Sequence, residues 1–186
     1  MALAAFTPTC GKNIPGNAPE LYLIEANKIT SVTETANEIS AVTMAGTAKF
    51  HKVKADFDSV QFTSEGTFKT TGGETQNLIF RVSKGDTAAE NFVISLKDAA
   101  PCGMVAIYVD GNRQAKAFGI SAATKEGKTR PINQVAVSYD SGTLITDEDT
   151  QAYTITLTRL GYYGPIPFNG TANATITGGS AEFITW

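Results

Sequence analysis

The stretch that decides the fold lies near the middle of the chain, at residues 104–120, and reads MVAIYVDGNRQAKAFGI. Its first arm, residues 104–109, is apolar and rich in β-branched residues, so we expect a strand that is buried on both faces. Asp110 and Gly111 follow. Asp-Gly between two strand-like arms predicts a hairpin, because glycine accepts a positive φ and aspartate tolerates it. The stretch therefore predicts β-sheet packing, and it contains no catalytic motif.

The segment just before this hairpin predicts a helix. Asp86 is a good N-cap, Glu90 lies in the first turn, and Pro101 ends the segment. Apolar residues recur between them at helical spacing, at Ala89, Phe92, Val93 and Leu96. We therefore expect one amphipathic helix over about residues 87–99, leading directly into the hairpin.

Much of the remaining chain alternates between apolar and polar residues, which is typical of strands with one buried face. The clearest alternation places His51, Val53 and Ala55 on one face, against Lys52 and Lys54 on the other. Strands are expected at residues 21–24, 29–32, 39–44, 51–57, 60–65, 77–82 and 152–157, and a last hairpin at residues 171–186.

The domain organisation follows from the lack of internal boundaries. The 186 residues contain no linker and no repeat of fixed period, so we expect a single domain over residues 1–186. The expected architecture is mainly β: a β-sandwich or barrel with one flanking α-helix at about residues 87–99. Proline and glycine punctuate residues 1–19, which predicts an extended N-terminal arm. Sheet edges left open in such a fold are suited to pairing with another copy.

Composition and charge argue against several classes of protein. Charged residues make up 18% of the chain and the formal net charge is -3, so the sequence does not predict an electrostatic nucleic-acid binder. No apolar run approaches a membrane span, and residues 1–6 are too short for a signal-peptide core. We expect a soluble protein that is made in the cytoplasm and has no membrane partner.

The residues that could carry metal or nucleophilic chemistry are few. His51 is the only histidine, and we expect it to be a partly buried strand residue. Cys10 and Cys102 are the only cysteines; two reduced thiols are expected, with one disulfide as the alternative. These three residues are too scattered to predict a zinc site.

Two motifs that resemble ligand sites do not meet the requirements of those sites. Residues 126–129 read EGKT, as at the end of a phosphate-binding loop, but Ala122 stands where that loop needs glycine. Asp140, Asp147 and Asp149 could supply oxygens to calcium, but no glycine-centred loop surrounds them, so solvated turns are expected. We therefore expect no catalytic, cofactor-binding or metal-binding residues, no cofactor and no enzymatic activity.

The order of elements carries a family resemblance. The helix-to-hairpin run at residues 92–112 is followed by an arm that ends in an aromatic residue and glycine, at residues 116–120. A Ser-Gly turn at residues 139–143, an acidic connection at residues 147–149 and the strand at residues 152–157 complete the pattern. In this order the chain resembles the tail tube proteins of long-tailed bacteriophages and the related inner-tube proteins of contractile injection systems. The last hairpin has no counterpart in that pattern.

The resemblance implies a structural virion protein of the phage tail. Subunits would form hexameric rings whose sheets join into a continuous β-barrel, and the rings would stack into a tube. The N-terminal arm and a loop, at residues 33–38 or 70–74, would reach the adjacent ring. DNA would pass the lumen without specific binding, and tape measure and tail terminator proteins would be further partners. Arg113 and Lys116 would face solvent or an adjacent subunit.

Two other functions stay open at this point. One is another virion or surface component with a β-sandwich, such as a capsid decoration or adhesin domain. The other is a glycoside-active β-sandwich enzyme, since any two of the 18 acidic residues could meet in space.

Overall fold

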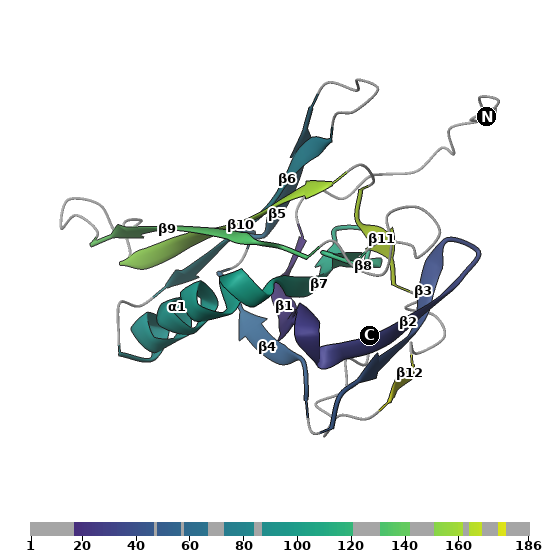
Figure 1. The fold of residues 1–186 in the computed structure, drawn as a ribbon. Helices are drawn as coiled ribbons and strands as arrows, with labels where there is room; N and C mark the ends of the chain where they lie inside the picture. The colour runs from purple at the N-terminus through teal and green to yellow at the C-terminus, as the bar shows by residue number, and fades with distance from the viewer. Residues whose placement is uncertain are drawn as a thin grey trace, which may run out of the picture.

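The computed structural model describes residues 17–46, 48–56, 58–66, 73–83, 87–120, 131–141, 151–161, 164–168 and 175–177. These residues form a mainly β fold with a single α-helix, which confirms the predicted fold class (Figure 1). The helices are α1 (Thr87–Ala99) and two short 3-10 turns, η1 (Ala26–Lys28) and η2 (Ala100–Cys102). The strands are β1 (Asn17–Glu25), β2 (Ile29–Thr35), β3 (Glu38–Met44), β4 (His51–Lys54), β5 (Gln61–Glu65), β6 (Glu74–Ser83), β7 (Met104–Asp110), β8 (Ala115–Phe118), β9 (Gln134–Asp140), β10 (Ala152–Gly161), β11 (Ile166–Pro167) and β12 (Thr175–Thr177).

The strands form three sheets, with the five-stranded sheet in the middle. Its strand order is β11-β8-β7-β1-β4; the second sheet has the order β5-β6-β10-β9 and the third β12-β3-β2. Figure 1 shows the middle sheet between the other two. Each face of the middle sheet has its own apolar core, one shared with the β5-β6-β10-β9 sheet and α1, the other with the β12-β3-β2 sheet.

The central strands β1 and β7 supply both cores by alternation. On β7, Ala106 and Tyr108 belong to the first core, whereas Val105 and Ile107 belong to the second. All residues from Met104 to Val109 are buried. The expectation that the first arm of the hairpin is buried on both faces is confirmed, because a middle layer has no solvent-facing side.

The hairpin between β7 and β8 exists, but its turn differs from the predicted one. Arg113, and not Gly111, takes the left-handed conformation, with φ +62°. The Arg113 N–H donates to the Asp110 carbonyl at 2.9 Å, and the Asp110 N–H donates to the Gln114 carbonyl at 3.0 Å. This is a type I turn followed by a left-handed residue, the arrangement of a three-residue hairpin loop. The Asp110 carboxylate accepts the N–H groups of Asn112 and Gln114, both at 2.9 Å, which stabilises this turn.

The basic residues of the second arm have different environments. Arg113 is exposed, as expected. Lys116 is half-buried, and its Nζ lies 3.0 Å from Oδ2 of Asp110, so it pairs within the hairpin. Gly119, just beyond β8, has φ +93°, and a Cβ there would lie 2.7 Å from the Met104 carbonyl oxygen. This position therefore requires glycine.

The helix predicted over residues 87–99 is confirmed as α1. Its buried residues are Ala89, Val93 and Leu96, and the last two join the first core. Pro101 lies in η2, directly after the helix, as expected for a residue that cannot continue it. Asp86, the expected N-cap, lies outside the described residues.

Several elements depart from the expected boundaries. The segment around Tyr139 and Asp140, expected as a turn, is the end of the seven-residue strand β9, whose alternating Val135, Val137 and Tyr139 are the signal for it. Residues 33–38, expected as a loop, are two strand ends joined by a tight turn at Ala36 and Asn37. A type I′ turn needs positive φ at both central residues, and both have it.

The two chain ends were expected to be an arm and a hairpin. Strand β1 begins at Asn17, so residues 17–19 of the expected arm belong to a strand, and residues 1–16 lie outside the described part of the chain. In the last expected hairpin, residues 175–177 form β12, which pairs in parallel with β3. Its turn and second arm, like residues 70–72 of the other expected loop, lie outside the described residues.

Candidate functional site

The residues considered for metal or nucleophilic chemistry do not come together in the described part of the chain. No group of three or more histidine, cysteine, aspartate or glutamate side chains there could hold a metal ion. His51 is the first residue of β4 and is exposed, so the expectation that it is partly buried is wrong: β4 is an edge strand, which leaves its end open to solvent. Cys102 is exposed and has a free thiol.

The remaining sequence candidates have little structural context. Asp140 ends β9 and is exposed, whereas Cys10, Asp147, Asp149 and residues 126–129 lie outside the described residues. Among the helices that the structure describes, none is long and apolar enough to cross a membrane.

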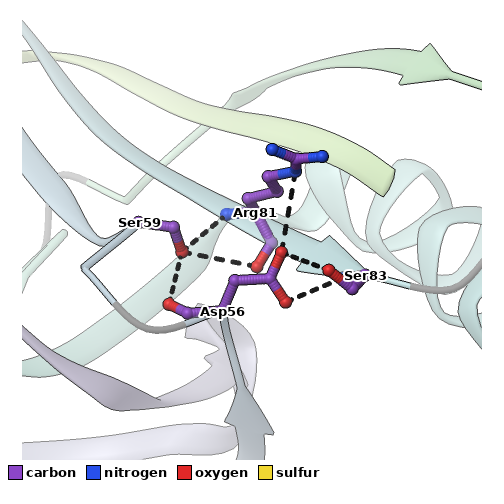
Figure 2. A network of polar contacts seen from close by, with 4 residues as sticks. All are labelled: Asp56, Ser59, Arg81 and Ser83. Carbon is purple, nitrogen blue, oxygen red and sulfur yellow. Dashed lines mark hydrogen bonds and ion pairs between the residues drawn. The ribbon is translucent and has the colours of Figure 1, made fainter. Parts of the chain in front are cut away.

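A polar network joins the β4–β5 connection to the end of β6 (Figure 2). The Asp56 carboxylate accepts hydrogen bonds from the Ser83 N–H, at 3.0 Å, and from the Ser83 hydroxyl. Its Oδ2 also lies 3.6 Å from Nε of Arg81. The Ser59 hydroxyl donates to the Asp56 carbonyl at 2.7 Å and accepts the Arg81 N–H at 3.2 Å.

This network resembles a serine-and-carboxylate site in residue types but not in chemistry. No histidine or lysine belongs to the described contacts of Figure 2, so neither serine hydroxyl there has the kind of base that usually activates a serine nucleophile. Its contacts instead fix the chain where it passes from the middle sheet to the β5-β6-β10-β9 sheet. The arrangement therefore supports a structural role.

A buried arginine is the residue that sequence reasoning missed. Arg159 on β10 is only 1% exposed, and its Nε donates to Oε1 of Gln76 on β6 at 2.7 Å. The guanidinium carbon lies 5.4 Å from the centre of the Phe118 ring, a cation–π contact between the two sheets. Position 159 continues the inward-facing series of Ile155 and Leu157, which is the signal that could have identified it.

Tyr108 is the other ionisable group within the first core. Burial raises the pKa of its hydroxyl, and the nearby Asp110 raises it further. The hydroxyl therefore stays protonated near neutral pH, which makes it unsuited to general-base chemistry.

The three sheets leave strand edges open among the described residues. The middle sheet ends at β4 and β11, the second sheet at β5 and β9, and the third at β2 and β12. Two of these edge strands, β2 and β9, have seven residues each, and β9 has the sequence QVAVSYD. Tyr139 on this strand is 49% exposed, and its ring lies 4.8 Å from that of Tyr153.

The β5-β6-β10-β9 sheet also has one face without a covering element in the described part of the chain (Figure 1). The register places Thr154, Thr156 and Thr158 of β10 on this face, because Ile155 and Leu157 face the core. The uncharged residues that share this face on the other three strands are Asn77, Ile79, Ser138, Ala136, Gln134, Thr63 and Gln61. The register also places three charged residues on this face: Arg81 of β6, Glu65 of β5 and Asp140 of β9.

The described residues offer surfaces on which further strands could pair. The β5-β6-β10-β9 sheet has an open edge on each side, and the face between these edges is rich in threonine. No protein-family model, no curated protein and no solved structure matches this chain.

Proposed function

We propose that this chain is a structural protein without catalytic activity, whose copies join edge to edge into hexameric rings that stack into a phage tail tube. The observation that carries the proposal is that the β5-β6-β10-β9 sheet is open at both ends among the described residues. Edge strands of this kind are template surfaces for pairing with another chain. The resemblance in the order of elements supports the more specific identity as a tail tube protein.

The strand directions favour pairing of β9 in one copy with β5 in the next. Neighbouring strands in this sheet are antiparallel throughout, so β5 and β9, three steps apart, run in opposite directions. A β9–β5 junction is therefore also antiparallel and continues the sheet without a break. Such a head-to-tail contact closes into a ring when the rotation per copy allows it.

The side chains of the two edges match across this junction. Val135 and Val137 of β9 and Phe62 of β5 are partly buried against the first core. Apolar residues of the two copies would therefore meet on the face of the sheet that covers this core. On the other face, Ala136 and Ser138 would meet Gln61 and Thr63, which are small or uncharged. No like charges are brought together, which favours the pairing.

The threonine-rich face fits the lumen of such a tube. Phosphate groups are attracted by clustered lysine and arginine, and this face carries Arg81 alone of those residue types in the described sheet. Arg81 is itself paired with Asp56. DNA could then slide past the Thr154–Thr156–Thr158 row without being held, and the tape measure and tail terminator proteins would occupy and close the same tube.

Electron microscopy of the concentrated full-length chain tests the proposal. We expect rings and tubes of constant diameter, with six-fold symmetry in end views. Removal of residues 1–16, which precede β1, is expected to leave rings that no longer stack. A chain that stays monomeric, or forms a closed trimer, would contradict the proposal and favour a capsid decoration or adhesin domain.

A further inference from the structure

A groove with a volume of about 670 Å³ lies between α1 and the open edge of β4. Its lining comes mainly from α1 on one side and from β4 and neighbouring residues of β1 on the other. A groove of this size is comparable to ligand sites in proteins. Three features indicate what it could bind: the α1 side of the groove, the edge of β4 and the charged residues around it.

The α1 wall of the groove is apolar and uncharged. It consists of Ala88, Ala89, Phe92, Ser95, Leu96 and Ala99. Met104 of β7 and Val53 of β4 continue this apolar surface. The side of an occupant that faces α1 therefore has to be apolar to be stabilised there.

The β4 side of the groove is an edge of the middle sheet among the described residues. β4 pairs with β1 through the register Leu21↔Val53 and Tyr22↔Lys52, and the described part of the chain places no strand on its other side. An extended segment that paired with this edge would add a strand to the middle sheet. Main-chain pairing of this kind selects an extended peptide over a compact ligand.

The charges around the groove are predominantly positive. Lys28, Lys49, Lys52 and Lys54 border it and are exposed, and Glu25 is the one acidic residue among the described residues of the lining. His51 is also exposed at this edge, and the α1 wall adds no charge. This contrasts with the net charge of -3 for the whole chain, so the groove is complementary to an acidic occupant.

Alternation along β4 places its apolar residue on one face of the sheet and its two lysines on the other. Val53 belongs to the first core, on the face of the sheet toward α1, whereas Lys52 and Lys54 lie on the opposite face. Residues on a strand paired with β4 would alternate in the same way. One face of that strand would meet Val53 and the α1 wall, and the other would meet the two lysines.

We propose that this groove binds an extended segment of a partner protein, in which apolar residues alternate with aspartate or glutamate, as an added strand on β4. A single-stranded nucleic acid fits less well, because the described residues of the lining include one phenyl ring, that of Phe92, and no tyrosine or tryptophan on which a base could stack. The inference goes beyond tube formation and does not rest on it, since β4 belongs to a different sheet from β5 and β9.

Fluorescence anisotropy with labelled, end-capped peptides tests this proposal on the full chain. The probe is a peptide in which valine and glutamate alternate, and its control has the same composition arranged in two blocks. We expect saturable binding of the alternating peptide, about tenfold tighter than that of the block peptide, because only alternation puts valine and glutamate on opposite faces. Added salt should weaken the binding, and amide chemical shifts should change in β4 and α1.

Charge reversal on β4 provides the specific variant. Lys52→Glu combined with Lys54→Glu should weaken binding of the valine–glutamate peptide about tenfold or more and create binding of a valine–lysine peptide. Lys97→Glu, on the part of α1 outside the groove, is the matched control and should leave the affinity unchanged.

Four results would overturn the proposal: no binding at low salt, equal binding of the block peptide, equally tight binding of a single-stranded oligonucleotide, or shift changes away from β4 and α1. Changes in β4 amides on raising the protein concentration alone would also contradict it, since a second copy would then occupy the groove. A chain that forms tubes but binds no alternating peptide contradicts this inference without affecting the proposed function.

Discussion

The edges of β4 and β9 are both open in the described residues, but they differ in length and charge. β4 has the sequence HKVK over four residues, and β9 has the sequence QVAVSYD over seven. Lysine on an edge strand discourages pairing with a second copy of the same strand, because two such strands would bring like charges together. β9 contains no lysine, arginine or proline, and its one charged residue is Asp140 at its end, so most of its length does not discourage pairing.

The difference indicates that the two edges suit different partners. An edge with few charges pairs with any strand whose alternation matches, which includes β5 of another copy. A basic edge beside an apolar wall pairs only with a strand that is acidic on one face and apolar on the other. One fold can thus use β9 for self-assembly and keep β4 for a partner of opposite charge.

The largest expected effect comes from giving β9 the charge pattern of β4. Ala136→Lys combined with Ser138→Lys adds charges at exposed positions, so we expect ring and tube formation to be lost while the monomer stays folded. Sedimentation velocity and electron microscopy measure assembly, and thermal unfolding should show a change within about 0.5 kcal/mol. Asn91→Lys combined with Gln114→Lys adds the same charge at exposed positions outside β9, and should assemble normally. Normal tubes from the β9 variant would show that this edge is not the assembly interface.

The second-largest expected effect is a loss of stability on replacing Asp56, which fixes the connection between the β4 edge and the β5 edge. Asp56→Ala removes the acceptor for the Ser83 N–H and hydroxyl and the partner of Arg81, so we expect a loss of about 2–3 kcal/mol of unfolding free energy. Urea denaturation measures this loss. Asp56→Asn keeps a neutral acceptor and should lose about half as much, whereas Asp98→Ala on exposed α1 should change stability by less than about 0.5 kcal/mol. If Asp56→Ala and Asp98→Ala lowered the free energy of unfolding equally, the Asp56 network would not be what fixes this connection.

Local signals in the sequence were sufficient for much of the fold. The helix at residues 87–99 is specified by apolar residues at helical spacing and by Pro101, all within one segment. The burial of β7 on both faces follows from its lack of polar residues before Asp110. These elements could be predicted because the interactions that define them are local or depend on composition alone.

The features that escaped prediction depend on distant parts of the chain. Arg159 is buried because Gln76 and Phe118, far away in sequence, provide an acceptor and a ring. The exposure of His51 follows from the position of β4 at a sheet edge, and strand order is set by tertiary packing. The open edges and the groove, which carry both proposals, could not be predicted for the same reason. The left-handed Arg113 was missed because the Asp110 side chain, and not glycine, stabilises that turn.

The third effect removes the lysines that distinguish β4 from β9. Lys52→Thr combined with Lys54→Thr leaves an uncharged edge with high β propensity, so we expect several-fold greater self-association, as irregular aggregates rather than tubes. Light scattering as a function of protein concentration measures this change. Lys49→Thr combined with Lys97→Thr removes the same charge outside β4 and should scatter like the unmodified chain. If both variants aggregate equally, net charge protects the chain and the position of the lysines on the edge does not.

The smallest effect separates stability from the behaviour of the two edges. Ala36 has φ +54° in the tight turn between β2 and β3, a conformation that costs a residue with a Cβ about 1–2 kcal/mol. Ala36→Gly relieves this strain but gives the unfolded chain more freedom, so we expect a net gain of about 0.5–1 kcal/mol in urea denaturation. Ala41→Gly, within strand β3, is the matched control. It should lower the free energy of unfolding by about the same amount, because it gives the unfolded chain more freedom without relieving backbone strain in the folded state.

Neither glycine variant touches β4 or β9, so tube formation and binding of the alternating peptide should be the same in both. If either property instead followed the opposite changes in stability, the contrast between the two edges would reflect how well the monomer is folded. If both properties stay constant while stability moves in both directions, the charge on each edge is what selects its partner.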